Sequence, residues 1–344
     1  MKNFNIFTKH KKTILIFISA LLLVLLGIIL ISGSNKDKID ISNHESYTET
    51  PISESVDKTQ ANIKTTEESD YVLNETAFCT GIGSATNETV VCKDKNKKLL
   101  TGKVIEYFPN GKVHRKFIMK NGHADGLWQR FIENGNLAIE SIYKDGKRNG
   151  VGKTYYENGK LQYETPFKDD KRNGVVKIYY ENGKLQGEVP FKDDKRNGVD
   201  KGYYENGNLK FETPFKDDKR NGVSKSYYEN GNLKFETSFK DDKQNGGHKV
   251  YDTNGALVGE RNYKDGKANG LSTEYLNGQI SKEETYKDDK KNGPTRTYLN
   301  GNLREEIEYK NGMMDGVYIL YTTYDGSIYQ KKIYKNGRVI KTIK

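Results

Sequence analysis

An Asn-Gly turn, written once as Asp-Gly, returns at a nearly constant interval through most of this 344-residue chain. The turn glycines are Gly111, Gly135, Gly159, Gly183, Gly207, Gly231, Gly255, Gly278, Gly301 and Gly326, spaced by 24 residues six times and then by 23, 23 and 25. A fixed period of this length is typical of repeat arrays, in which each unit buries its apolar side chains against its neighbours. The sequence therefore predicts ten copies of one unit rather than one compact domain.

Apolar residues follow a strict pattern inside the unit. We number each unit from the glycine that opens it, for example Gly174, as position 0. Position 1 is nearly always aliphatic, position 5 is aromatic, position 11 is leucine and position 17 is Phe or Tyr; here these are Val175, Tyr179, Leu185 and Phe191. All four positions are odd, and a period of two on each side of a turn predicts two β-strands per unit and no helix.

The register of each hairpin depends on the length of its turn. A three-residue Glu-Asn-Gly loop that ends in a left-handed glycine pairs position 5 with position 11 and puts Val, Tyr, Leu and Phe on one common face. A two-residue Asn-Gly loop shifts the register by one residue, and it would pair Lys177 with Glu188 and Lys225 with Glu236. We predict the three-residue loop, with a G1 β-bulge at its glycine.

The repeated unit, G-x-x-x-x-Y-Y-E-N-G-x-L-x-x-E-x-x-F-K-D-G-K-x-N, resembles the MORN repeat variant of bacterial proteins of the YwqK type, over about residues 100–344. The resemblance implies an all-β hairpin array without catalysis, in a family often labelled as the antitoxin side of toxin–antitoxin systems. At Asp170, Asp194, Asp218 and Asp242 the chain departs from the motif, with Lys-Asp-Asp in place of Lys-Asp-Gly.

The composition excludes a single large core. The chain is 34% apolar and 30% charged, and its mean hydropathy is −0.87, so aromatic residues must supply much of the buried area. We expect an all-β repeat array over residues 105–344, an elongated and twisted antiparallel β-meander of about ten hairpin units of 23–25 residues. Its apolar face would be covered by curling or by self-association with a second chain.

The N-terminus predicts a membrane anchor. Residues 13–32, TILIFISALLLVLLGIILIS, contain no charge and are long enough to cross a bilayer as one transmembrane helix. The lysines that precede them are Lys2, Lys9, Lys11 and Lys12. The positive-inside rule then predicts a cytosolic basic N-terminus, residues 1–12, and a periplasmic or cell-surface location for the repeats. The alternative is a signal peptide cleaved near residues 32–34, which would release a secreted protein.

Two further segments separate the anchor from the repeats. Residues 33–76 are rich in Ser and Thr, are acidic and have no apolar period, which predicts a flexible linker. Cys79 and Cys92 lie thirteen residues apart, and in an exported chain such a pair predicts a disulfide. We expect this disulfide to staple an N-terminal cap of residues 77–104.

Nothing in the sequence indicates an enzyme. The five histidines are scattered, and Asp and Glu recur with the repeat as turn and strand residues do, so we expect no catalytic residues, no cofactor and no metal site. The net charge of +10 fits an anionic partner, but an exported location argues against nucleic acid.

The candidate binding residues lie at even positions. Positions 2, 4 and 13 vary freely between otherwise copied units, which we interpret as the solvent face of the first strand. Position 6 shares that face; it is tyrosine in four consecutive units and is flanked by lysines, which gives the set Tyr156, Tyr180, Tyr204, Tyr228, Lys160 and Lys184. An exposed ladder of this kind suits weak repeated contacts with an anionic or glycan polymer or with an extended protein surface. The alternative is that these tyrosines only cover backbone and pair across strands.

Together these features favour a non-enzymatic, membrane-anchored and exported repeat scaffold. It would bind a protein, or an anionic or glycan partner of the cell envelope or cell surface, through a multivalent sheet face. The alternative, which the resemblance suggests, is an antitoxin-like neutraliser of a cognate protein toxin.

Overall fold

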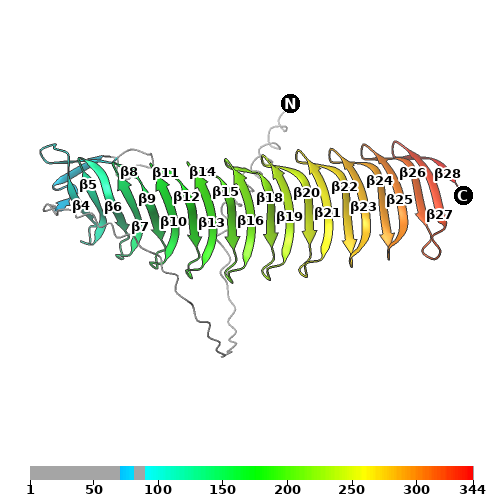
Figure 1. The fold of residues 1–344 in the computed structure, drawn as a ribbon, viewed down its shortest axis with the longest axis horizontal. Coiled ribbons are helices and arrows are strands. Elements are labelled where there is room, and N and C mark those ends of the chain that lie inside the picture. The colour runs from blue at the N-terminus through cyan, green and yellow to red at the C-terminus, as the bar shows by residue number, and fades with distance from the viewer. Residues whose placement is uncertain (1–69, 81–89, 344) are drawn as a thin grey trace, which may run out of the picture. The chain divides into compact units, whose positions relative to one another are not determined.

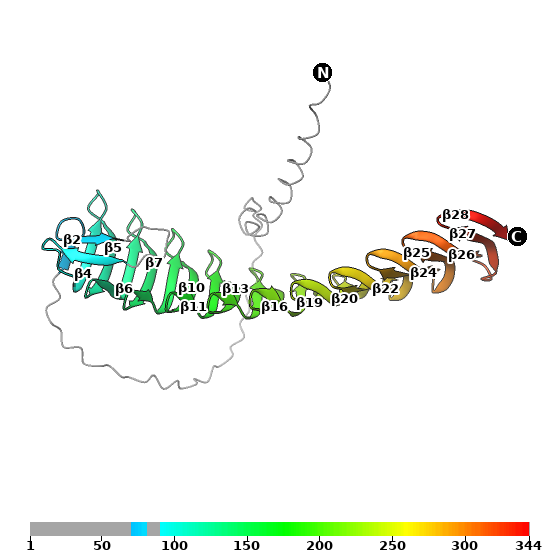
Figure 2. The ribbon, with the colours of Figure 1, turned by 90° about the horizontal axis from the view of Figure 1, so that it is seen from above.

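The computed structural model describes residues 70–80 and 90–343, so the predicted membrane segment and nearly all of the predicted linker lie outside the described residues. Within those ranges the chain contains strands and no helix, and its 28 strands belong to one open sheet. No membrane-spanning helix therefore occurs in the described part of the chain. The strands of the repeats lie side by side in chain order (Figure 1), and the sheet twists along its length (Figure 2). The prediction of an all-β antiparallel meander is confirmed for these residues.

Ten consecutive hairpins make up the repeats. They are β4 (Gly102–Tyr107) with β5 (Val113–Lys120), β6 (His123–Phe131) with β7 (Leu137–Lys144), β9 (Gly150–Tyr155) with β10 (Leu161–Lys168), β12 (Gly174–Tyr179) with β13 (Leu185–Lys192), β15 (Gly198–Tyr203) with β16 (Leu209–Lys216), β18 (Gly222–Tyr227) with β19 (Leu233–Lys240), β20 (Lys243–Tyr251) with β21 (Leu257–Lys264), β22 (Lys267–Leu276) with β23 (Gln279–Lys287), β24 (Lys290–Leu299) with β25 (Asn302–Lys310), and β26 (Met313–Tyr321) with β27 (Ile328–Lys335). Short strands connect some of them, β8 (Lys147–Arg148), β11 (Lys171–Arg172), β14 (Lys195–Arg196) and β17 (Lys219–Arg220), and β28 (Arg338–Ile343) is the last strand.

The turn prediction is confirmed in seven hairpins. In the unit opened by Gly150, Tyr155 pairs with Leu161, and the amide of Tyr156 donates to the carbonyl of Lys160 at 2.8 Å. Gly159 ends the three-residue loop with a φ of +82°, a conformation that glycine adopts without strain. The turns at Gly111, Gly135, Gly183, Gly207, Gly231 and Gly255 have the same pairing.

The two-residue loop occurs where the spacing is shorter. Leu276 pairs with Gln279 around Asn277 and Gly278, and Leu299 pairs with Asn302 around the next turn. These are the turns at which the interval falls to 23 residues. The missing residue of the unit is therefore lost from the turn.

A further β-bulge, outside the turn itself, follows each long turn and was not predicted. In the unit opened by Gly174, Tyr179 pairs with Leu185, yet two residues away Lys177 pairs with Glu188, so Gln186 is the extra residue. Both of the expected registers therefore occur, one on each side of the bulge. Lys225 and Glu236 pair in the same way in a later unit.

The bulge corrects the expected face of the phenylalanine. A shift of one residue reverses which face a side chain occupies, so Phe191 pairs with Gly174 and lies on the opposite face from Val175. The expectation that Val, Tyr, Leu and Phe share one face is wrong for Phe. We call the side that carries positions 1, 3, 5, 11, 14 and 16 the valine face, and the side that carries positions 2, 4, 13, 15 and 17 the phenylalanine face.

The phenylalanine face holds most of the buried side chains of the repeats. Position 2 is nearly closed to solvent at Val176, Asp200 and Ser224, which are 7–8% exposed. A Cβ added to Gly152, at the same position, would lie 3.2 Å from the ring of Phe167, so the position-17 rings cover this row. The expectation that free variation at position 2 marks the solvent face is therefore wrong. Position 2 accepts small, apolar and polar residues because the position-17 rings, and not the residue itself, exclude solvent there.

The N-terminal cap contributes the one purely apolar cluster of the described residues. Its strands are β1 (Asp70–Val72), which pairs in parallel with β4, and the hairpin of β2 (Ala77–Thr80) with β3 (Val91–Asp94). A disulfide joins Cys79 to Cys92, which face each other across that hairpin. Cys92, Val104 and Phe117 are at most 1% exposed and belong to the cluster, which therefore closes the first end of the sheet.

Candidate functional site

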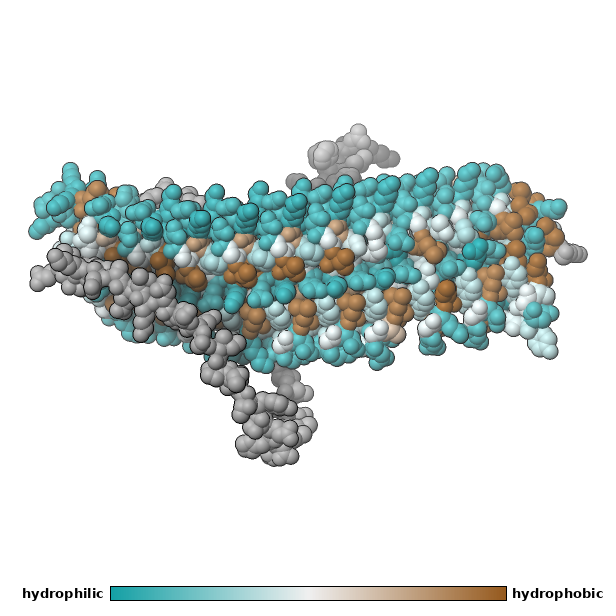
Figure 3. All heavy atoms as spheres, in the orientation of Figure 1, coloured by the Kyte–Doolittle hydropathy of each residue, from teal (hydrophilic) through white to brown (hydrophobic). Residues whose placement is uncertain are grey.

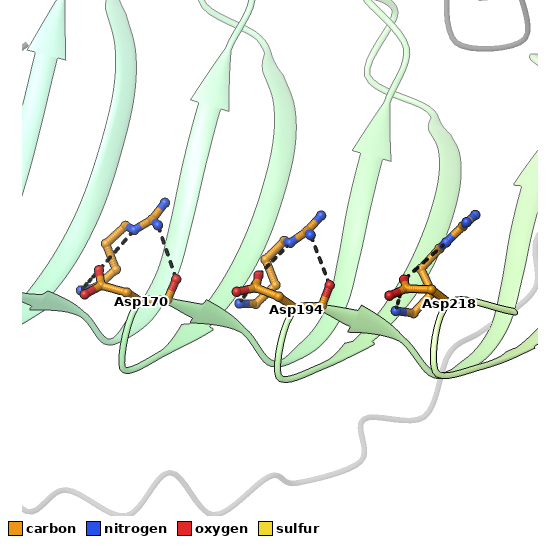
Figure 4. A network of polar contacts seen from close by, with 6 residues as sticks. Asp170, Asp194 and Asp218 are labelled. Atoms are coloured by element: carbon orange, nitrogen blue, oxygen red, sulfur yellow. Dashed lines mark hydrogen bonds and ion pairs between the residues drawn. The ribbon is translucent and has the colours of Figure 1, made fainter. Parts of the chain in front are cut away.

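The most regular polar contacts join the arginine before one unit to the aspartate turn of the next (Figure 4). The amide nitrogen of Arg172 donates to Oδ1 of Asp194 at 2.9 Å, its Nε to the same oxygen at 3.0 Å, and its Nη2 to the Asp194 carbonyl at 3.1 Å. The guanidinium carbon also lies 3.9 Å from the ring centroid of Phe191. We call this set of contacts the arginine clasp; it recurs at Arg148 with Asp170 and at Arg220 with Asp242.

The clasp explains four of the five Lys-Asp-Asp turns; in the fifth, Asp289 accepts a hydrogen bond from the amide of Ala268 and no arginine is present. Asp170 occupies the second position of a two-residue turn with a φ of +68°, which aspartate tolerates better than most residues. In the Lys-Asp-Gly turns at Gly146 and Gly266, the glycine amide still bonds to the preceding unit, at Ala124 and Gln244, but there is no carboxylate. Aspartate thus stands in the turn wherever arginine stands 22 residues earlier.

The clasp also stabilises the charged form of its aspartates. The donating backbone amide of Arg172 is the main cause that lowers the pKa of Asp194, and the Arg172 side chain adds to it against the opposing effect of burial. Arg220 lowers the pKa of Asp242 in the same way. Both carboxylates are about half exposed, so each ion pair contributes little by charge alone. The regular contact between consecutive units is the main result of the clasp.

The four candidate tyrosines do not form a free ladder. The Tyr156 hydroxyl donates to the carbonyl oxygen of Tyr179 at 2.7 Å, in the next unit, and all four rings are half-buried. Tyr180, Tyr204 and Tyr228 donate in the same way, at 2.7, 2.8 and 2.9 Å. Burial raises the pKa of Tyr156, Tyr180 and Tyr204. The expected exposed ladder is therefore corrected: these hydroxyls tie each unit to its successor.

The two candidate lysines lie beside the turns and are exposed. The Nζ of Lys184 donates to the carbonyl oxygen of Glu205 at 2.8 Å, which is another link to the next unit. Lys160 contributes its backbone amide to Asn158 at 3.0 Å, within its own turn. The structure thus brings the candidate lysines to the turn edge of the sheet, close to tyrosines whose hydroxyls are already bonded.

The valine face presents two apolar rows with a hydrophilic row between them (Figure 3). One row holds position 1, where Val151, Val175, Val199 and Val223 are each 41–45% exposed. The other row holds the position-11 leucines, which are half-buried. Leu127 and Leu271 extend the first row at its two ends and are also exposed. Aliphatic side chains therefore face solvent at regular intervals along much of the array.

The hydrophilic row between them is nearly neutral. The Tyr179 hydroxyl donates to a carboxylate oxygen of Glu164 in the preceding unit at 2.9 Å, and the Nζ of Lys225 lies 3.3 Å from Glu212. Seven tyrosine–glutamate pairs repeat this contact: Tyr155–Glu140, Tyr179–Glu164, Tyr203–Glu188, Tyr227–Glu212, Tyr251–Glu236, Tyr275–Glu260 and Tyr298–Glu283. Burial and the glutamate together raise the pKa of Tyr179 to about 12. Lysines and glutamates of this row offset each other, so the face has no strong sign of charge.

One ionisable group is buried on the phenylalanine face without full compensation. Asp200 is 7% exposed, its Oδ1 has no hydrogen-bond partner, and its Oδ2 lies 3.6 Å from Nη1 of Arg196. Burial raises the pKa of Asp200 to about 6 against the opposing effect of Arg196. Arg196 makes the weakest clasp, since its Nε is 3.9 Å from Oδ1 of Asp218. Asp200 thus draws this arginine away from its turn.

No metal centre emerges in the described residues. No three side chains of the types His, Cys, Asp and Glu come together there as metal ligands. His114 lies 3.0 Å from Glu106, and His248 lies 2.8 Å from the hydroxyl of Thr237. The arginine clasps and the exposed valines were not predicted from the sequence. The clasps could have been predicted from the recurrence of arginine ahead of the Lys-Asp-Asp turns.

Comparison with known proteins identifies the repeat. Seven consecutive segments match the MORN repeat variant, residues 100–121, 124–145, 148–169, 172–193, 196–217, 220–241 and 244–265, and a shorter match covers residues 297–311. No curated protein has a matching sequence.

Solved structures show only distant similarity. The crystal structure of TcdB2-TccC3-Cdc42 is 12% identical with a TM-score of 0.17, over 71% of this chain and 15% of that one. The Photorhabdus luminescens Tc holotoxin pore is 13% identical with a TM-score of 0.17, over 72% of this chain and 16% of that one. The chain thus spans less than a fifth of either protein, and similarity at this level carries no argument about function. The repeat match stands by itself: the chain contains an array of MORN repeat variants, seven of them consecutive between residues 100 and 265.

Proposed function

We propose that this chain is a non-enzymatic repeat scaffold that binds a protein partner through the valine face. The single observation that carries the proposal is the row of exposed valines at a pitch of one unit. Aliphatic side chains that stay 41–45% exposed in four successive units gain free energy when another surface removes them from water. Each contact is small, and repetition along the array multiplies their effect.

The chemistry of this face favours protein over glycan. Recognition of sugars and cationic groups usually relies on free aromatic rings, whereas the exposed row here is aliphatic and the tyrosines of the face are bonded to glutamates. An anionic polymer would bind a face with a net positive charge, but the lysines and glutamates of the valine face alternate and offset each other. A partner with a flat surface and its own aliphatic side chains matches the two rows better.

The location of this scaffold follows from the N-terminal sequence. An uncharged segment at residues 13–32 behind four lysines favours a membrane anchor with the repeats outside the cytosol. The antitoxin-like, YwqK-type alternative also requires a protein partner and would use the same rows. The two differ in the identity of that partner, a cell-envelope or cell-surface protein in the first case and a toxin in the second.

Photo-crosslinking in intact cells tests the proposal. A photoreactive amino acid at Val175 or Val199 should yield an adduct with another protein, and the same amino acid at Tyr163, which is 37% exposed on the phenylalanine face, should not. Mass spectrometry of the adduct identifies the partner. An adduct of twice the chain mass would show self-association instead, and adducts of equal yield from both faces, or from neither, would contradict the proposal.

A matched variant separates binding from folding. In the chain that carries the photoreactive amino acid at Val199, Val151, Val175 and Val223 would be changed to Ser. Because these side chains are already partly solvated, the circular dichroism spectrum should be retained while the adduct is lost.

A further inference from the structure

A hollow opens on the phenylalanine face in the unit that follows the last arginine clasp. It lies over β20, β21 and β22 and has a volume of about 240 Å³. Its lining includes His248, Val250, Gly259, Arg261, Tyr263 and Glu274. These side chains are opposite the valine face, so the hollow is independent of the function proposed above.

The hollow results from three departures from the repeat at one place. Position 13 is Gly259, where the units at Tyr163, Phe211 and Phe235 carry a ring. Position 15 is Arg261, where earlier units carry Ser, Thr or Val, and position 2 is His248, where the preceding unit carries Ser224. The register places His248 opposite Arg261, and Arg261 opposite Ser272. The three departures therefore meet side by side.

The glycine is not required by the backbone. A Cβ at Gly259 would meet nothing closer than the Thr273 carbonyl at 3.6 Å, so a larger residue fits there. At Gly187, the other glycine of this position, a Cβ would come within 3.1 Å of the Lys201 carbonyl, and the Ile178 side chain lies nearby at 3.8 Å. What distinguishes Gly259 is the open space that the missing ring leaves.

The side chain of Arg261 supplies the positive charge in the hollow. Its Nε donates to the Ser272 hydroxyl at 3.2 Å, and its guanidinium carbon lies 4.9 Å from the ring centroid of Tyr286. No carboxylate of the described residues forms an ion pair with it, in contrast to the clasp arginines. Its two terminal nitrogens are therefore left as donors, in the fork geometry that suits an oxyanion.

His248 supplies a second donor beside it. Its Nδ1 lies 2.8 Å from the Thr237 hydroxyl, and burial together with Arg261 lowers the pKa of the ring, which favours the neutral imidazole. When the Thr237 hydroxyl donates to Nδ1, the single ring proton lies on Nε2. Tyr263 forms an edge-on ring contact with His248, at 6.3 Å between centroids, and so walls one side.

We propose that this hollow binds an oxyanion, a carboxylate or phosphate group carried by a small polar molecule. The terminal nitrogens of Arg261 and the Nε2 of His248 donate to the oxyanion, and the space above Gly259 holds the atoms attached to it. Glu274, which pairs with Gly259 and also lines the hollow, accepts a hydroxyl or amino group of the same molecule.

The repeat itself supplies the test variants. Gly259→Phe copies Phe235, Arg261→Thr copies Thr237 and His248→Ser copies Ser224, so each introduces a residue that already occupies that position in the preceding unit. Lys249→Ala is the control, since it removes a positive charge on the opposite face next to His248. Isothermal titration of the full-length chain in detergent, at constant ionic strength, would use inorganic phosphate, acetate and glucuronate as probes.

We expect saturable binding of at least one probe by the unmodified chain. Arg261→Thr and Gly259→Phe should each weaken it by about tenfold or more, and Lys249→Ala by less than about twofold. Phosphate binding without carboxylate binding, or the reverse, shows which oxyanion the hollow takes. No saturable binding of any probe, or equal binding by Arg261→Thr and the unmodified chain, overturns the proposal. Circular dichroism of each variant verifies that the array has folded.

Discussion

Asp200 should make the stability of the array depend on pH in a direction opposite to that of an ordinary surface aspartate. Its carboxyl is 7% exposed, its Oδ1 has no partner, and burial raises its pKa from 3.8 to about 6. Because the folded state holds the proton more tightly, the stability from this group is complete below the unfolded pKa of about 4 and is lost as pH rises through about 6.

The size of the effect follows from the pKa shift. A shift of about two units corresponds to about 3 kcal/mol between the two ends of the pH range. Asp200→Ser, which copies Ser224 of the next unit, removes the titrating group. The variant should therefore gain stability relative to the unmodified chain as pH rises from 4 to 7.5, by about 2–3 kcal/mol.

Urea unfolding of both chains at the two pH values measures this difference. Asp194 and Asp242, whose pKa values the clasp lowers, are present in both chains, so their contribution cancels in the comparison. A repeat array need not unfold in one step, so hydrogen exchange of the β15 amides should accompany the urea curves. If the two chains lose or gain stability in parallel across this range, Asp200 is not the buried charge that its geometry indicates.

Two other changes test the inter-unit contacts and the ring packing. Arg172→Gln should lower stability by about 1 kcal/mol at pH 7, because it removes the cation–π contact and the charged hydrogen bonds to Asp194. The part of the loss that comes from the side-chain hydrogen bond to the Asp194 carboxylate should disappear in acid, as pH falls through the lowered pKa of Asp194, while the part from the cation–π contact should remain. A loss that does not change with pH would contradict the prediction. Gly202→Val should cost about 1–2 kcal/mol, because a Cβ there would meet the ring of Phe211 and displace it. Gly247→Val is the matched control; it enters open space at position 1 and should change the urea midpoint little.

The sequence predicted the hairpins well because the information for them is local. Asn-Gly turns and the period of two determine strands, and the three-residue loop, chosen because it puts Val, Tyr and Leu on one face, occurs in seven turns. The bulge at Gln186 was missed because it needs a comparison of two registers within one hairpin. Once it shifts the register, Phe191 changes face, and every inference about which side is solvated changes with it.

The binding residues were harder to predict because burial in a single-layer sheet depends on neighbouring units. Variation at position 2 suggested exposure, yet rings from position 17 cover it. Tyr156 looked free in the sequence, but its acceptor is a backbone carbonyl 23 residues away, and no side-chain pattern indicates a backbone acceptor. Arg148 and Asp170 could have been paired from the sequence, since arginine stands 22 residues before the second aspartate in four of the five Lys-Asp-Asp turns and before neither of the Lys-Asp-Gly turns.

Each repeated segment supplies the aspartate of one arginine clasp and the arginine of the next clasp, so it contacts both the unit before it and the unit after it. The string PFKDDKRNGV carries both halves, and it is identical at Pro166, Pro190 and Pro214. Inserting or deleting one such block would recreate the same junction on either side and leave the capped start and the last strand unaltered. Gene duplication could thus lengthen or shorten this protein in steps of one hairpin, and the length of its sheet could evolve without a new interface between units.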